Sequence, residues 1–301
     1  MPAEILPLFP IDRPVRLLAP AKVNLFLDIL ERRPDGFHNL DAVNVSVDFF
    51  DEMEITLNDE GENRIFCDSP EIPTDEDNHL AKALFEILSG TRWGVTIRLA
   101  KRIPVGAGLG GGTSDAAALI RYLARAFNLN ERELLIKALQ VGSDVPYCLI
   151  GGTARVEGRG EIVEPLDDLA PLRLVLLDPG LSNATPKIYA RLLPSSERRH
   201  PPADLFVEAW REGDLELVGL QMFNAFQDLV FEQVPRLARL REKLLGQGCL
   251  GVCLTGTGSN LVGLLDLRQP DSDRWDWEPE DCRLRTVRTL PRDFPGWFQR
   301  L

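Results

Sequence analysis

The residues best suited to chemistry in this chain are a glycine-rich stretch at residues 104–115, PVGAGLGGGTSD, and two charged side chains, Lys22 and Asp144. The stretch runs directly into a segment of apolar residues at helical spacing, which predicts a loop that opens a helix. Glycine lets the backbone take positive φ and approach a ligand closely, and a helix start offers unpaired N–H groups and a positive dipole end. These are the properties of a phosphate-binding loop.

Three other interpretations fit this loop less well. Gly106, Gly108 and Gly111 fit the dinucleotide-binding pattern G-x-G-x-x-G. That fold also needs a following strand that ends in an acidic residue, but here the sequence predicts the start of a second helix at that position. A P-loop needs a lysine where Gly112 precedes Thr113. A flexible surface loop rarely starts a helix so cleanly. If the loop holds a triphosphate, its charge partner therefore comes from elsewhere.

The chemistry that such a loop serves is phosphoryl transfer, which also needs a metal and a group that orients or deprotonates the attacking hydroxyl. Asp144 lies in a predicted tight turn and could be the base, and a nearby lysine would keep it charged and stabilise an alkoxide. Lys22 shares one face of a predicted strand with Asn24. Sequence alone does not bring Lys22 to Asp144, and a turn carboxylate or a solvated lysine explains each one separately.

Alternating strands and periodic helices would position these groups. Predicted strands are 15–18, 23–29, 43–49, 53–57, 95–99, 153–165, 174–177 and one in the tail. Predicted helices are 79–90, 116–127, 131–140, one from residue 185 and three within 204–246. Residues 19–22 break the first strand, and the acidic segment 58–77 is expected to be a loop or an excursion at the sheet edge. The amino-terminal part therefore opens as an antiparallel sheet.

Length and composition limit the class of protein. A chain of 301 residues suggests one large or two modest domains, which we expect at 1–165 and 166–301. The net charge of −12 argues against binding to nucleic acid or an anionic membrane. The five cysteines form no disulfide or metal pattern, and neither a signal peptide nor a membrane span is visible. We expect a cytoplasmic protein.

Four segments of the chain together resemble the GHMP kinase superfamily. They are APAKVNLFLDILERRPDGFHNL, KRIPVGAGLGGGTSDAAA, VGSDVPYCL and TGTGSN. The resemblance implies a two-domain α+β fold, ribosomal-protein-S5-like in its amino-terminal domain and ferredoxin-like in its carboxy-terminal domain. The first segment is most similar to kinases that use ATP and Mg²⁺ to phosphorylate the 2-hydroxyl of a cytidylyl-linked methylerythritol in the non-mevalonate isoprenoid pathway.

The resemblance also implies roles for individual residues. Asp144 would be the catalytic base and Lys22 its partner. The ATP site would comprise Asn78, Lys101, Pro104, Val105, Gly106, Ala107, Gly108, Leu109, Gly110, Gly111, Gly112, Thr113 and Ser114. Of these, Asn78 and Lys101 would lie on the adenosine side, and Ser114 is a candidate contact for phosphate or magnesium. The substrate site would comprise Asn24, Phe37, His38, Thr185 and Tyr189. Phe37 and Tyr189 would sandwich cytosine, and His38 would bind its edge.

Some positions differ from the family pattern. Phe37 and Asn39 replace a tyrosine and a glutamate, and Thr113 replaces a serine. Ala225 and Gln227 replace two acidic residues in the segment FNAFQDLVF. Two alternatives therefore stay open: another GHMP-type kinase for homoserine, mevalonate or a sugar, and a non-catalytic nucleotide-binding protein. The expected partner is a small-molecule substrate, with a homodimer also compatible.

Overall fold

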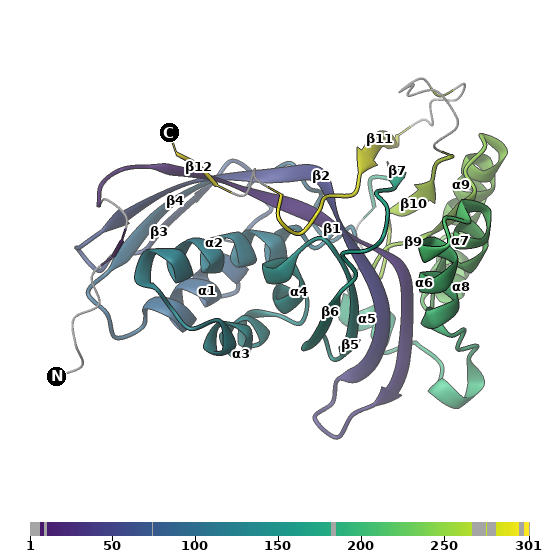
Figure 1. Cartoon of the computed structure of the whole chain (residues 1–301), viewed down its shortest axis with the longest axis horizontal. Helices are drawn as coiled ribbons and strands as arrows, with labels where there is room; N and C mark the ends of the chain where they lie inside the picture. The colour runs from purple at the N-terminus through teal and green to yellow at the C-terminus, as the bar shows by residue number, and fades with distance from the viewer. Residues whose placement is uncertain are drawn as a thin grey trace.

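The computed structural model of this chain describes residues 7–8, 11–73, 75–181, 185–266, 275, 281–294 and 298–300. Two sheets organise the described chain, one of eight strands and one of four, each covered by helices (Figure 1). This is the α+β composition that the family resemblance implies. Among the described residues, none of the helices has the length and apolar character needed to cross a bilayer.

The first sheet is built on a long antiparallel hairpin of β1 (Val15–Arg32) and β2 (His38–Asn58). The strands added to it are β3 (Arg64–Cys67), β4 (Gly94–Ala100), β5 (Thr153–Gly158), β6 (Ile162–Pro165), β8 (Phe223–Asn224) and β12 (Phe298–Arg300). β3 lies within residues 58–77 at the end of the strand order, so this part of the segment is the predicted edge excursion and not a loop.

The predicted break in the first strand was also wrong. β1 continues through Pro20, and the register of its pairing with β2 shifts between Pro20 and Lys22. A bulge of this kind accommodates a proline, which cannot donate to the ladder. One uninterrupted strand therefore carries both Lys22 and Asn24.

Four helices cover one face of the first sheet (Figure 1). They are α1 (His79–Leu88), α2 (Gly111–Phe127), α3 (Glu131–Val141) and α4 (Val145–Ile150). The Asn78 side chain caps α1 by accepting from the backbone N–H of Leu80, and Asn130 caps α3 in the same way. Asp144 precedes α4, a short helix where the sequence predicted only a turn.

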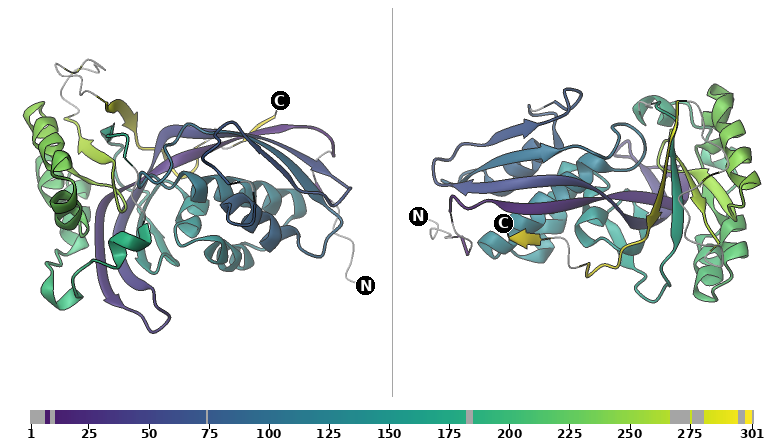
Figure 2. Two further views of the ribbon diagram at one scale, coloured as in Figure 1. Left: turned by 180° about the vertical axis from the view of Figure 1, so that it is seen from behind. Right: turned by 90° about the horizontal axis from the view of Figure 1, so that it is seen from above.

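The second sheet has the antiparallel order β11 (Arg283–Arg288), β7 (Arg173–Asp178), β10 (Leu261–Leu264) and β9 (Gly251–Leu254). The helices beside it are α6 (Ala203–Arg211), α7 (Leu215–Gln221), α8 (Gln227–Gln233) and α9 (Pro235–Gly246), at the opposite end of the molecule from the N-terminus (Figure 2). The predicted breaks at Gly213-Asp214 and near Pro235 are confirmed, but the predicted number of three helices was wrong, because β8 separates α7 from α8. The connection from β7 contains α5 (Thr185–Tyr189).

Sheet membership changes after β6, which ends at Pro165, and before β7. Two later strands nevertheless return to the first sheet: β8 pairs with β1 in parallel and β12 pairs with it antiparallel. The division at residues 165 and 166 stays a prediction. Because β8 joins β1 beside Phe26 and Leu27, the second half of the chain reaches the strand that carries Lys22.

Candidate active site

The glycine-rich stretch forms a loop between β4 and the start of α2, which confirms the predicted loop-to-helix arrangement. Gly106, Gly108 and Gly110 have φ angles of 66°, 78° and 63°, in the left-handed region. Gly110 is the N-cap of α2, and no side chain occupies the cap position. The first N–H groups of α2 are therefore presented at the loop, where an anion could accept from them.

A second glycine turn, Thr255 to Gly258, supports this loop from the carboxy-terminal half of the chain. The Thr255 hydroxyl donates to the Gly108 carbonyl at 3.2 Å and accepts from the Asn24 N–H at 3.0 Å. The Gly256 N–H donates to Asn24 Oδ1 at 2.9 Å. A Cβ on Gly108 would lie 2.0 Å from the Thr255 carbonyl oxygen, so only glycine permits this approach.

Lys22 and Asp144, far apart in the sequence, lie together beside the loop. The Lys22 backbone N–H donates to the Leu109 carbonyl at 2.9 Å, which ties β1 to the loop. Lys22 Nζ lies 2.9 Å from Asn24 Oδ1 and 3.2 Å from Asp144 Oδ2. Lys22 is 5% exposed, whereas the Asp144 side chain is 40% exposed. A buried ammonium thus holds a carboxylate that remains accessible to a ligand.

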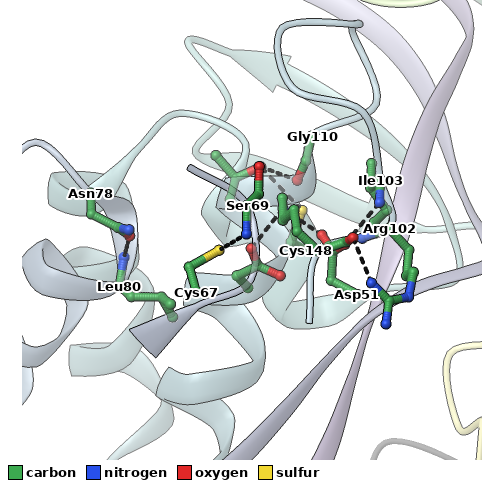
Figure 3. A network of polar contacts seen from close by, with 12 residues as sticks. Asp51, Cys67, Ser69, Asn78, Leu80, Arg102, Ile103, Gly110 and Cys148 are labelled. Atoms are coloured by element: carbon green, nitrogen blue, oxygen red, sulfur yellow. Dashed lines mark hydrogen bonds and ion pairs between the residues drawn. The ribbon is translucent and has the colours of Figure 1, made fainter. Parts of the chain in front are cut away.

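Lys101 lies beneath the loop in a buried cluster with two carboxylates. Its Nζ is 2.5 Å from Asp51 Oδ2 and 2.8 Å from Asp115 Oδ2. Asp51 Oδ1 also accepts from the backbone N–H groups of Arg102 and Ile103 (Figure 3). The pKa of Lys101 is lowered by burial, but the two carboxylates outweigh this and raise it overall. Burial raises the pKa of Asp115 to about 7; the Asp51 carboxylate also raises it, and Lys101 opposes both effects.

A cavity of about 470 Å³ joins these groups. Residues 104–113 line it, together with Lys22, Asn24, Asn78, Lys101, Asp144 and Tyr189. Ser114 is buried, and its backbone N–H donates to the Gly110 carbonyl at 2.9 Å rather than facing the cavity. The structure thus brings the predicted base, its lysine partner and most of the predicted ATP site around one space.

The predicted cytosine site is only partly assembled. Tyr189 lines the cavity between His38, whose ring centroid is 5.5 Å away, and Phe226, at 4.8 Å. Burial lowers the pKa of His38, and two nearby arginines lower it further. Phe37 is half exposed, and the Arg159 guanidinium lies 4.3 Å from its ring centroid. Neither Phe37 nor His38 lines the described cavity, so the sandwich stays a prediction.

Thr185 begins α5, but its side chain lies outside the described part of the structure. The predicted roles of Asn78 and Lys101 at adenosine also stay predictions. The Asn78 side chain donates to the Pro73 carbonyl while it caps α1, and Lys101 is engaged with its two carboxylates.

Several residues of the site escaped sequence reasoning. Asn44 accepts from Asn24 Nδ2 at 2.6 Å, and Asn224 donates to the Gly256 carbonyl at 2.8 Å. Asn44 lies on the polar side of the alternating segment 43–49, which was its one sequence signal. The unusual Gln227 accepts from the Leu254 N–H at 3.3 Å and so tethers α8 to the second glycine turn. His79 lines the cavity and had no motif to mark it.

Comparison with known proteins gives two family matches and several close relatives. The family "GHMP kinases N terminal domain" matches residues 78–152, and "GHMP kinases C terminal" matches residues 206–274. A 4-diphosphocytidyl-2-C-methyl-D-erythritol kinase from Brevibacillus brevis is 35% identical over 255 residues, which cover 83% of this chain and 87% of the relative.

Solved structures agree with these matches. A crystal structure of 4-(cytidine 5'-diphospho)-2C-methyl-D-erythritol kinase is 32% identical with a TM-score of 0.68, and the alignment covers 83% of this chain and 89% of that one. A homoserine kinase from Cytophaga hutchinsonii has a TM-score of 0.66 at 21% identity and covers 86% and 87% of the two chains. The second likeness concerns the fold alone.

Proposed function

The chain belongs to the GHMP kinase family and is a small-molecule kinase with the two-domain α+β fold of that family, and we propose how its residues perform the reaction. The substrate is 4-diphosphocytidyl-2-C-methyl-D-erythritol, the alcohol that appears in the names of the related kinases. ATP is the phosphoryl donor, and the product carries phosphate on the former 2-hydroxyl. The reaction belongs to the non-mevalonate route to isoprenoid precursors.

The observation that carries the proposed chemistry is the Lys22–Asp144 pair beside the glycine loop. Asp144 Oδ2 takes the proton from the substrate's 2-hydroxyl. The hydroxyl oxygen then forms a bond to the γ-phosphorus of ATP while the bond between that phosphorus and the ADP oxygen breaks. Lys22, 3.2 Å from Asp144 and tied to Leu109 through its backbone, supplies positive charge where the alkoxide develops. The N–H groups at the start of α2 donate hydrogen bonds to the phosphate oxygens.

Magnesium fits the residues at the start of α2. Asp115 Oδ1 is buried, lacks a hydrogen-bond partner, and belongs to a residue that lines the cavity. The described residues contain no cluster of three or more His, Cys, Asp or Glu side chains that could hold a metal alone. Magnesium usually binds through one or two carboxylates together with substrate phosphates. Asp115, or Ser114 beside it, would hold the ion, which would supply positive charge to the phosphates.

The test measures ATP consumption by the purified protein with magnesium and one of four alcohols. These are 4-diphosphocytidyl-2-C-methyl-D-erythritol, homoserine, mevalonate and galactose, with Asp144→Asn as the control. We expect turnover with the cytidylyl substrate alone and its loss in the variant. Turnover with another alcohol instead would contradict the assigned substrate. Unchanged turnover in Asp144→Asn would contradict the role of Asp144 as the base.

We also propose a cytoplasmic location and leave a homodimer open. All five cysteines are free thiols, which suits a reducing compartment. Light scattering of the purified protein would give its oligomeric state.

A further inference from the structure

His79 lies where the phosphate-binding helix start meets the turn that carries Asp144. It is the first residue of α1 and lines the cavity. Its imidazole packs against Gly112 and Gly142. A Cβ added to Gly112 would lie 3.2 Å from His79 Nδ1, and a Cβ added to Gly142 would lie 3.4 Å from His79 Nε2. Gly112 is in the first turn of α2, and Gly142 closes α3 two residues before Asp144. The ring thus touches both halves of the reaction site.

The polar atoms of this ring have no hydrogen-bond partner among the described residues. The charged groups facing it are Lys82 on its own helix, Lys101 after β4, and Asp144 before α4. Asp115, a carboxylate in the first turns of α2, is paired with Lys101. Burial lowers the pKa of His79, the two lysines lower it further, and Asp144 opposes them. The ring is therefore neutral near pH 7, in a cavity whose loop is built to accept an anion.

We propose that His79 binds the triphosphate of ATP and takes up a proton when the nucleotide binds. This inference rests on the proposed function, because it requires ATP phosphates at the start of α2. A phosphate held by the first N–H groups of α2 would lie beside the ring edge that faces Gly112. An opposite charge within about 4–6 Å raises the pKa of a histidine by about 1–3 units, because it stabilises the imidazolium.

ATP binding should weaken as the pH rises, because His79 must take up a proton when the nucleotide binds. Free protein holds neutral His79 at neutral pH, and the complex holds the imidazolium, so binding consumes protons between the two pKa values. Within that window the Kd for ATP should rise by up to about tenfold per unit of pH. Below both pKa values, and above both, the contribution of His79 to the slope vanishes.

The experiment is calorimetric titration of ATP into the intact protein, without the alcohol substrate, from pH 5.5 to 8.5. Each titration is done in two buffers of different ionisation enthalpy, which gives the number of protons taken up. The variants are His79→Gln and His79→Asn, which keep one polar edge of the ring but do not titrate. His200→Gln is the matched control, because His200 is bonded to Asp28 and does not line the cavity. The chain has three histidines, so imidazole NMR signals can be assigned by variant.

The expected result is that the wild type and His200→Gln take up protons when ATP binds, and that both His79 variants take up fewer, by up to about one proton. In the wild type, the NMR signal of His79 should shift to that of the imidazolium when ATP binds. ATP binding with equal uptake in wild type and His79 variants would overturn the inference and leave the kinase function intact. Absence of ATP binding in the wild type would overturn the proposed function and the inference together.

Discussion

Replacing Gly108 with alanine tests how closely the phosphate-binding loop packs against the second glycine turn. Gly108 has φ +78°, and an added Cβ would lie 2.0 Å from the Thr255 carbonyl oxygen and 2.9 Å from its carbon. Both atoms belong to the backbone, so no side chain can rotate to relieve the contact. The loop and the turn must separate, which also strains the hydrogen bond from the Thr255 hydroxyl to the Gly108 carbonyl.

Two effects set the size of the destabilisation. An alanine in the left-handed region costs about 1–2 kcal/mol relative to glycine. Forcing a methyl group into a packed site costs about 1–3 kcal/mol more. We therefore expect Gly108→Ala to lower the free energy of unfolding by about 2–5 kcal/mol. Gly213→Ala is the matched control, because Gly213 has φ +75° and no atom within 4 Å of the added Cβ.

The assay is urea unfolding of both variants, with the KM for ATP measured in parallel. Gly213→Ala should lose only the backbone term of about 1–2 kcal/mol and keep the wild-type KM. A displaced loop that loses about 1.4 kcal/mol of phosphate binding would raise the KM for ATP about tenfold in Gly108→Ala. Equal destabilisation of the two variants, with equal KM values, would refute the packing of the loop on Thr255.

Three further predictions concern the base, the buried lysine and the thiols. Asp144→Asn should reduce turnover by about 10²–10⁴-fold in a coupled ADP assay, because a general base contributes that much, and a smaller loss would reduce its role to positioning. Lys101→Met should lower the free energy of unfolding by about 3–5 kcal/mol, because two buried carboxylates lose their cation; a change below about 1 kcal/mol in urea unfolding would contradict this. Burial raises the pKa to about 12 for three of the five free cysteines, Cys148, Cys249 and Cys253. Iodoacetamide at neutral pH should therefore spare these three in native protein and label all five after unfolding, as counted by mass spectrometry.

Sequence reasoning succeeded where the chemistry is local. The loop that opens α2 follows from its glycines, and the shared face of Lys22 and Asn24 follows from strand alternation. It failed where a contact depends on the register of distant strands. Asp51 meets Lys101 across 50 residues because β2 and β4 pair antiparallel, with Glu52 opposite Ala100. No local pattern marks such a carboxylate as the partner of a buried lysine.

Sequence reasoning missed the continuous strand through Pro20 and the position of His79 in the cavity for related reasons. Proline is a local signal for a break, but pairing along most of two long strands outweighs one missing donor, which the register shift absorbs. A histidine at a helix start carries no signal by itself. It acquires significance only when Gly112 and Gly142, from two other helices, close on its ring.

The position of Asp144 depends on the same helix that presents the phosphate loop. Arg121, on α2, donates to the carbonyls of Cys148 and Leu149 at 2.9 and 2.7 Å, near the end of α4. Burial lowers the pKa of Arg121 to about 10, yet it stays charged near pH 7 and matches the negative end of α4. α4 follows directly after Asp144, so α2 fixes the proposed base through Arg121 and the proposed phosphate site through its own first turn. A change that tilts α2 would therefore displace its first turn and Asp144 together, whereas a change in β1 would displace Lys22 and Asn24 together with the loop at Leu109, to which the Lys22 backbone is bonded.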